Sequence, residues 1–181
     1  MEFVEPIRDK KTIDLVKNIL KKRKTRDYLL FLIGINSGLR ISDILNLKVK
    51  DVWNRSYIEI KEKKTGQLKR FPITKSFKTE LYEFLIGKDA EEWLFSSRKG
   101  NKAITRTQAY RIIHRACFQA GIKYRTGTHT LRKTFGYHFY QEYKDIALLQ
   151  NILNHCTPSV TLRYIGINQD LIDSSLYSFN L

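Results

Sequence analysis

Residues 26–36, RDYLLFLIGIN, constrain the fold of this 181-residue chain more than any other stretch. Between its polar ends the segment is apolar on every face of a helix. A helix of that kind needs neighbours on all sides to leave water. Its apolar run, 28–35, is too short to cross a bilayer, which takes about 20 residues. The segment therefore predicts a central helix that the rest of the chain covers.

Hydrophobic periodicity predicts the elements around this helix. Residues 56–62 alternate with period two, and 68–73 can pair with them across a turn at Thr65–Gly66. Residues 92–95 are a candidate short third strand. Helical spacing predicts further helices at 9–23, 40–47, 75–86, 105–120, 128–142, 145–153 and 157–165, with a weaker one at 169–177. The expected class is mostly α with a small antiparallel β-sheet (α+β).

Positive charge is the strongest signal in the composition. The chain has 33 Lys and Arg against 18 Asp and Glu, a net charge of +15. Such an excess favours a polyanionic partner, nucleic acid first of all. A basic protein with no such partner is the alternative, because charge alone indicates non-specific attraction and not a fold.

Several chemistries lack their usual motifs. The four histidines have no paired metal-ligand spacing, and neither HExxH nor the phosphate loop GxxxxGK[ST] occurs. Cys117 and Cys156 have no metal or redox spacing, so both are expected to be reduced packing residues. The sequence therefore predicts no metal and no cofactor, and a cytoplasmic protein without a membrane segment.

Two segments in the first half carry residues suited to phosphate binding. In SGLRISDILNL (37–47), Arg40 follows a predicted helix end, and Asp43 lies three residues later on the same face. A carboxylate there can orient the guanidinium group, although for this pair taken alone an ordinary surface ion pair is the favoured interpretation. The hairpin is rich in cations that suit either a DNA groove or the protection of a sheet edge: Lys61, Lys63, Lys64, Lys69 and Arg70.

Two further segments lie in the second half. In GTHTLRKTFGYHF (127–139), His129, Arg132 and Gly136 share a helix face away from the apolar stripe that begins at Leu131. A protonated histidine at a helix start is unfavourable unless an anion lies nearby; a capping histidine is the alternative. In LLQNILNHCTPSVTLRYIGI (148–167), Tyr164 falls on the last turn of a predicted helix, where a core tyrosine is the ordinary expectation.

Taken together, these residues occur as Arg, Lys, His-x-x-Arg, His and Tyr, the last nine residues after the final His. From about residue 5 to 165, this order and spacing resemble the catalytic domain of the tyrosine recombinases, the phage integrase family. SGLRISDILNL resembles the first arginine box, HTLR the second, and LNH the usual LGH. The resemblance nominates as catalytic Arg40, Lys64 (with Lys63 as the fallback), His129, Arg132, His155 and the nucleophile Tyr164, with Asp43 in support.

The resemblance implies a chemistry. The two arginines would grip a DNA phosphate while Tyr164 attacks phosphorus, giving a 3′-phosphotyrosine and a free 5′-hydroxyl. Lys64 would protonate the leaving oxygen, His129 would act as general acid/base, and His155 would donate to the phosphate. Gly136 would leave room for a DNA strand. The expected DNA-binding residues are Lys61, Lys63, Lys69, Arg70 and Lys133.

The same resemblance implies one catalytic domain over 1–181, with a core to about 167 and a tail at 168–181, and no N-terminal core-binding domain. The expected partner is double-stranded DNA, bound by a homotetramer in which the tail docks on its own domain or on a neighbour. Two other functions stay open: type IB topoisomerase-like relaxation of DNA with the same residues, and DNA binding without catalysis on the same scaffold.

Overall fold

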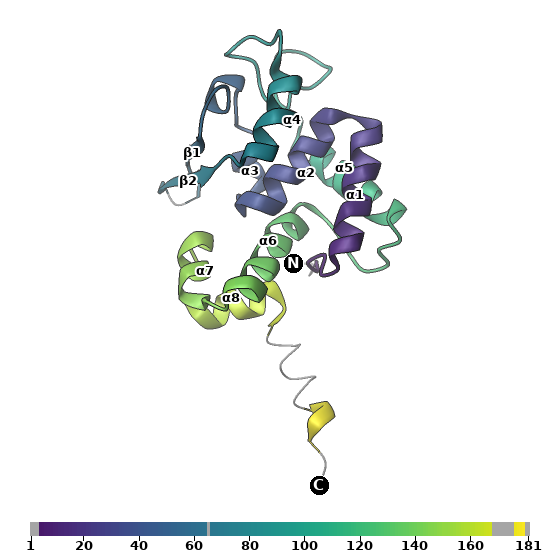
Figure 1. Ribbon diagram of the computed structural model, residues 1–181, viewed down its shortest axis with the longest axis vertical. Coiled ribbons are helices and arrows are strands. Elements are labelled where there is room, and N and C mark those ends of the chain that lie inside the picture. Colours follow the sequence, from purple (N-terminus) through teal and green to yellow (C-terminus); the bar gives the residue numbers. More distant parts are fainter. Residues whose placement is uncertain (1–3, 65, 168–175, 180–181) are drawn as a thin grey trace.

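The computed structural model describes residues 4–64, 66–167 and 176–179 (Figure 1). Within these ranges the chain is mostly helical with one two-stranded antiparallel sheet, so the predicted class is confirmed. The elements are α1 (Lys10–Arg23), α2 (Thr25–Ser37), α3 (Ile41–Ile44), the 3₁₀ helix η1 (Val49–Asp51), β1 (Tyr57–Lys61), β2 (Leu68–Pro72), α4 (Lys75–Leu85), α5 (Arg106–Gln119), α6 (Thr128–Tyr143), α7 (Ile146–Leu153) and α8 (Pro158–Ile165). No helix in the described ranges is long and apolar enough to span a membrane.

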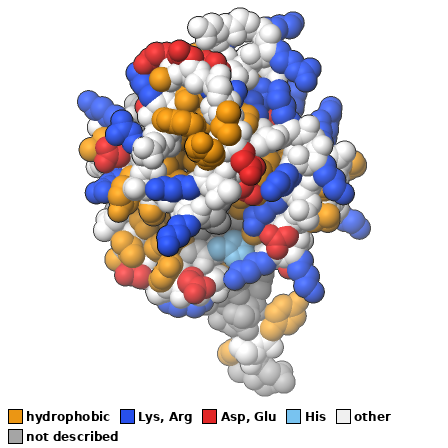
Figure 2. Space-filling view, turned by 45° about the horizontal axis from the view of Figure 1, so that its top comes forward, with side chains coloured by type: hydrophobic (Ala, Val, Ile, Leu, Met, Phe, Trp, Pro, Cys, Tyr) orange, Lys and Arg blue, Asp and Glu red, His pale blue; other side chains and the backbone are white. Residues whose placement is uncertain are grey.

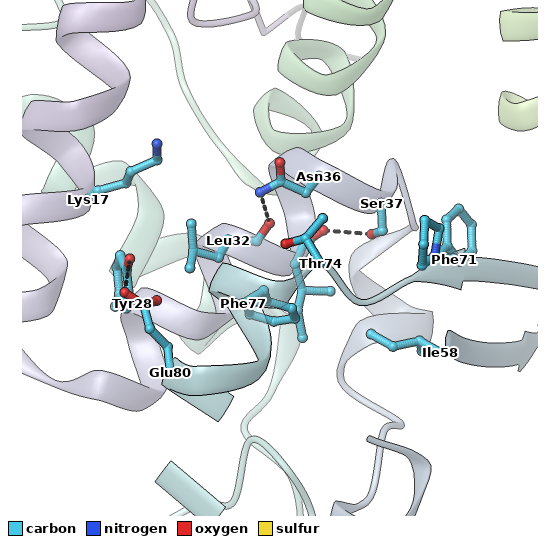
Figure 3. A pocket seen from close by; sticks show the side chains of 12 residues that line it. Lys17, Tyr28, Leu32, Asn36, Ser37, Ile58, Phe71, Thr74, Phe77 and Glu80 are labelled. Carbon is cyan, nitrogen blue, oxygen red and sulfur yellow. Dashed lines mark hydrogen bonds between the residues drawn. The ribbon is translucent and has the colours of Figure 1, made fainter. Parts of the chain in front are cut away.

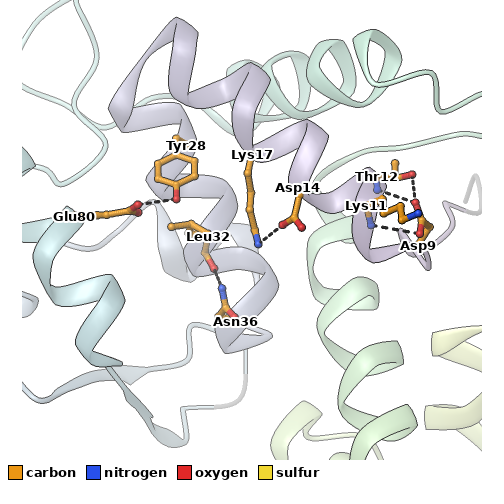
Figure 4. A network of polar contacts seen from close by, with 9 residues as sticks. All are labelled: Asp9, Lys11, Thr12, Asp14, Lys17, Tyr28, Leu32, Asn36 and Glu80. Atoms are coloured by element: carbon orange, nitrogen blue, oxygen red, sulfur yellow. Dashed lines mark hydrogen bonds and ion pairs between the residues drawn. The ribbon is translucent and has the colours of Figure 1, made fainter.

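Helix α2 is the centre of the fold, as its sequence predicts. Leu29, Leu30 and Phe31 are fully buried, and α1, α4 and α6 all pack against the helix. Helix α1 begins where the side chain of Asp9 accepts hydrogen bonds from the backbone N–H groups of residues 11 and 12 (Figure 4). That carboxylate satisfies N–H groups that have no partner within the helix.

Two glycines bring α6 close to α2. A Cβ atom on Gly34 would lie 2.5 Å from Cδ1 of Leu131, and one on Gly38 would lie 2.5 Å from Cδ1 of Phe135. Gly38 also ends α2 with a φ of +62°, a conformation that glycine adopts without strain. The turn that leads to Arg40 is therefore fixed directly against α6.

The hairpin has the predicted pairing, with the register running from Tyr57 opposite Pro72 to Lys61 opposite Leu68. The candidate third strand at 92–95 is wrong: Trp93 makes only an isolated bridge to Lys48. Leu94 and Phe95 are completely buried, so the apolar character of this segment serves the core. The helix predicted at 40–47 is shorter, 41–44, and most of the one predicted at 169–177 lies outside the described residues.

Helices α6, α7 and α8 form a second apolar cluster around Leu149, Leu153 and Ile165. Gly136 belongs to this cluster, because a Cβ atom there would lie 2.7 Å from Cγ2 of Ile165. The expectation that Gly136 makes room for DNA is therefore wrong; it makes room for α8. Both cysteines are free, but only Cys117 is buried, so the packing role predicted for Cys156, which is exposed, is also wrong.

Candidate active site

Arg40 lies on the turn between α2 and α3, with 19% of its side chain exposed. Its Nη1 is 2.7 Å from Oε1 of Glu62, a residue at the end of β1 that is 1% exposed. A buried ion pair of this kind holds the guanidinium plane in one orientation. The carboxylate that orients Arg40 in the structure is therefore Glu62, not the predicted Asp43.

Asp43 has a different task. It is 1% exposed, and its Oδ1 accepts a hydrogen bond of 3.2 Å from the backbone N–H of Lys63. This bond fixes the end of the hairpin strand one residue before Lys64. Asp43 and Glu62 thus tie the Arg40 turn to the hairpin, one through a backbone group and the other through a side chain.

The sequence carries a signal for Glu62 in the alternation of the strand. Ile58, Ile60 and Glu62 alternate along the strand, so all three point to the same face. That face is the inward one, since Ile58 is 3% exposed. A carboxylate on an inward face needs a cation as partner, because an unpaired buried charge is strongly unfavourable.

Arg132 is buried in α6, with 4% of the residue exposed. Its two terminal nitrogens donate to the backbone carbonyls of Gly38, at the end of α2, and Leu153, at the end of α7. Burial lowers the pKa of Arg132, and the nearby positive charge of Arg40 acts in the same direction. The guanidinium nevertheless stays charged, as arginine does in proteins. Two arginines from distant parts of the chain therefore place positive charge at one spot.

Tyr164 completes this cluster from the last turn of α8. Its phenol group lies close enough to Arg132 for that charge to act on it, and its ring lies edge-on to the imidazole of His155 with centroids 4.9 Å apart. Burial raises the pKa of Tyr164, while the charges of Arg132 and Arg40 oppose that rise. The phenol is therefore protonated at neutral pH and lies against the arginine pair.

The chain matches the description "Phage integrase family" over residues 7–170. It belongs to the phage integrase family. It is 52% identical to the probable integrase/recombinase YoeC of Bacillus subtilis over 170 residues, which cover 94% of this chain and 93% of YoeC. It is 29% identical to the tyrosine recombinase XerA of Pyrococcus furiosus over 167 residues, 90% of this chain and 58% of that protein.

A solved structure has the same fold. The XerH site-specific recombinase, bound to a palindromic difH substrate in a post-cleavage complex, superposes with a TM-score of 0.76 at 22% identity. The match covers 97% of this chain and 54% of the XerH chain. The protein is thus a tyrosine recombinase catalytic domain, and the predicted family and fold are confirmed.

His155 of the recombinase is neutral at neutral pH. Burial, followed by the positive charges of Arg132, Arg40 and Lys64, lowers its pKa to about 4. Its Nδ1 lies 3.1 Å from Oγ1 of Thr161, whose hydroxyl donates to the carbonyl of Thr157. That hydroxyl can only accept from the ring, so we assign the proton to Nδ1, which leaves Nε2 as an acceptor.

His129 lies in the first turn of α6 and is exposed. Partial desolvation lowers its pKa, and Arg132 is the largest of several cations that add to the effect. A neutral imidazole beside the arginine pair can take up a proton, which a histidinium cannot do. The described residues contain no group of three or more His, Cys, Asp or Glu side chains placed to hold a metal ion.

The cations of the hairpin differ in their exposure and in their hydrogen bonds. Lys61, Lys63, Lys64 and Arg70 are exposed. Lys64 is the one whose charge lowers the pKa of His155, which favours it over Lys63 as the lysine that faces the site. Lys69, in contrast, donates from Nζ to the carbonyl of Asn151 on α7 at 2.8 Å. Lys69 therefore tethers the hairpin to α7.

Lys133, which was predicted to bind DNA, is not part of the exposed basic surface. The residue is 4% exposed, and its Nζ lies 5.2 Å from the centroid of the Tyr164 ring. Its ammonium group therefore belongs to the enclosed cluster around Arg132 and Tyr164, and not to the exposed cations of the hairpin.

A pocket of about 370 Å³ lies between α2, α4 and the hairpin (Figure 3). Apolar side chains such as Leu32 and Phe77 form its walls. On its rim Glu80 accepts a hydrogen bond of 2.9 Å from the hydroxyl of Tyr28 (Figure 4), and burial followed by this bond raises the pKa of Tyr28. None of the clustered arginine, histidine or tyrosine side chains lines this pocket, so it is distinct from the candidate active site.

Proposed function

We propose that this chain is a site-specific recombinase that cleaves and rejoins double-stranded DNA through a 3′-phosphotyrosine intermediate. The observation that carries the proposal is the phenol of Tyr164 lying beside Arg132, with Arg40 near enough for its charge to act on both. A nucleophile held against two guanidinium groups suits attack on a phosphodiester, where negative charge builds up on the non-bridging oxygens.

The arginine pair would act by positioned charge. Arg132 uses two of its five N–H donors on the carbonyls of Gly38 and Leu153, which leaves donors for a phosphate oxygen. Arg40 is held by Glu62 through Nη1 and keeps its remaining donors for a second oxygen. Both groups are oriented before DNA arrives, so little reorganisation is needed when the transition state forms.

Two proton transfers accompany cleavage. The oxygen of Tyr164 forms a bond to phosphorus as its proton passes to a base, for which the neutral imidazole of His129 is our candidate. The bond from phosphorus to the 5′-oxygen breaks, and the ammonium group of Lys64 gives that oxygen a proton. Rejoining is the reverse, with the free 5′-hydroxyl attacking the phosphotyrosine.

His155 is proposed to contact the phosphate, as the sequence resemblance implies. With its proton on Nδ1, the neutral ring has no proton on Nε2 to donate. Donation to a phosphate oxygen therefore requires the ring to gain a second proton when DNA binds. The negative charge of the phosphodiester favours that uptake, because a nearby negative charge stabilises the imidazolium.

Assembly on DNA is also a proposal. Many Lys and Arg side chains lie along the edges of the face shown in Figure 2, in keeping with the net charge of +15. We propose that the whole of 1–181 acts as the catalytic domain, that four copies assemble on two duplexes in the cytoplasm, and that the tail at 168–181 docks either on its own domain or on a neighbour. Most of that tail lies outside the described residues.

The test is covalent trapping on nicked suicide duplexes with randomised arm sequences. The wild-type protein should form an adduct that resists denaturing electrophoresis, and Tyr164→Phe should abolish it while DNA binding stays nearly intact. Tyr143→Phe is the matched control, because Tyr143 is exposed at the end of α6 and should not matter. An adduct in Tyr164→Phe would instead assign the nucleophile to another tyrosine, with Tyr143 and Tyr177 examined next.

The same reagents separate the alternatives. Relaxation of a supercoiled plasmid by the lone protein, without exchange between paired sites, would favour a topoisomerase-like activity. DNA binding by the wild type without any adduct would favour a non-catalytic DNA-binding protein. Recombinant products between two copies of a trapped sequence would support the recombinase.

A further inference from the structure

Lys133 is buried next to the nucleophile in a place that the sequence did not lead us to expect. It follows Arg132 in α6, and its Nζ faces the ring of Tyr164 at 5.2 Å from the centroid. The helices that carry the two residues meet closely one turn further along, where Gly136 accommodates Ile165. The contact between ammonium and ring is thus fixed by the packing of α6 on α8.

Packing alone does not account for a lysine at this position. An ammonium group with almost no exposed surface is costly, and an apolar side chain of similar volume is often neutral or stabilising in its place. The face of an aromatic ring attracts a cation, most strongly where water is excluded. The ring of Tyr164 therefore offsets part of the cost of the buried charge.

We propose that Lys133 is a positioning residue: its ammonium group holds the ring of Tyr164 so that the phenol oxygen stays beside Arg132. This inference rests on the proposed function, because it presupposes that Tyr164 is the nucleophile. Loss of the charge should leave the fold intact and allow the ring to leave its place, so cleavage should slow without loss of stability.

The charge state of Lys133 depends on groups from three elements. Glu5, on the segment before α1, favours the charged form, while burial has the larger effect and lowers the pKa of Lys133 to about 8. His129 on α6 and Tyr164 on α8 also face it, and both are neutral at neutral pH. The positioning effect should therefore be present below that pKa and fade as pH rises through it.

The experiment compares Lys133→Met with Lys22→Met, which removes an exposed lysine on α1. Three quantities are measured for each protein: single-turnover cleavage of the nicked duplex, DNA affinity and melting temperature. We expect Lys133→Met to cleave about tenfold more slowly near pH 7, to bind DNA like Lys22→Met, and to melt at or above the wild-type temperature. The ratio of wild-type to Lys133→Met rates should fall towards one near about pH 9.

Each other outcome overturns the inference. Equal cleavage rates for Lys133→Met and Lys22→Met would mean that the charge does not position the nucleophile. A rate loss that is the same at both pH values and comes with a lower melting temperature would make Lys133 merely structural.

A second measurement does not depend on activity. The ε-methylene protons of Lys133, assigned by their loss in Lys133→Met, should be shifted upfield by the ring in the wild type and in Tyr164→Phe, but not in Tyr164→Leu. Absence of that shift would overturn the geometry itself. An upfield shift in a wild-type protein that forms no adduct would instead contradict the proposed function and leave the contact standing.

Discussion

The arginine cluster and the basic hairpin meet at the same site but are built in different ways. Arg132 is 4% exposed and is fixed by two backbone carbonyls between packed helices. The hairpin keeps most of its lysines exposed and is fastened by individual polar contacts: Arg40 with Glu62, Asp43 with the N–H of Lys63, and Lys69 with Asn151.

We infer from this difference that the arginine cluster and the hairpin have different roles. Groups that stabilise charge must already be in place when the transition state forms, which favours a site within the core. The acid that meets the leaving oxygen must come close only after DNA has bound, which suits an element that a few contacts hold. Loss of a core contact should therefore cost more than loss of a hairpin contact.

Arg132→Ala should have the largest effect. It removes the donor that we propose for the phosphate and leaves the carbonyls of Gly38 and Leu153 without their partner. We expect cleavage to slow by about 10² or more and stability to fall by about 1–3 kcal/mol. Single-turnover trapping and urea unfolding measure the two effects. A rate near that of the wild type would remove Arg132 from the site.

Glu62→Gln tests the link between the two regions. The amide keeps the shape of the side chain but leaves the partly buried Arg40 without its anion. We expect cleavage to slow by about tenfold through misorientation of Arg40. Glu59→Gln is the matched control on the same strand, because Glu59 is exposed and 3.8 Å from Arg70. Equal rates for the two variants would show that Arg40 needs no partner to stay in place.

The sequence predicted an element correctly where a single hydrophobic pattern determined it. The apolar stretch around Phe31 became the central helix, and the alternation around Ile58 became a strand. Residues 92–95 do not form the predicted strand, because apolar residues fill a core as readily as they form a strand. Gly136 was misread for a related reason: its small size makes room, but the sequence does not say whether a helix or DNA takes that room.

Errors at the site came from side chains whose partners are distant in the chain. Glu62 lies 22 residues beyond Arg40, so local spacing favoured Asp43 instead. Lys133 was predicted to bind DNA, although its environment depends on how α8 packs against α6. Resemblance to a family identified the residue types, whereas their pairing required the three-dimensional arrangement.

Lowering the pH should reduce the free energy of unfolding through His155, and not through the exposed lysines of the hairpin. Its pKa is about 4 in the folded protein, below the ordinary value of 6.5. Between these two values the unfolded chain binds the proton and the folded chain does not, so stability falls as pH drops through this window. His155→Gln should flatten the dependence of unfolding free energy on pH there, whereas Lys61→Gln should not. An unchanged slope in His155→Gln would contradict the lowered pKa.

Lys69→Met should have the smallest effect and shows whether the tether matters. The variant loses the hydrogen bond from Nζ to the carbonyl of Asn151, which lies at the surface. A single bond of this kind contributes about 1 kcal/mol, so cleavage should slow by a few-fold at most. Lys61→Met is the control, since it removes an equal charge from the same hairpin. Limited proteolysis near residues 61–68 should be faster in Lys69→Met alone, because the hairpin then opens more often. If both variants lose the same activity and resist protease equally, Lys69 contributes only charge. The hydrogen bond to Asn151 would then not hold the hairpin in place, which would contradict the contrast between a fixed arginine cluster and a tethered hairpin.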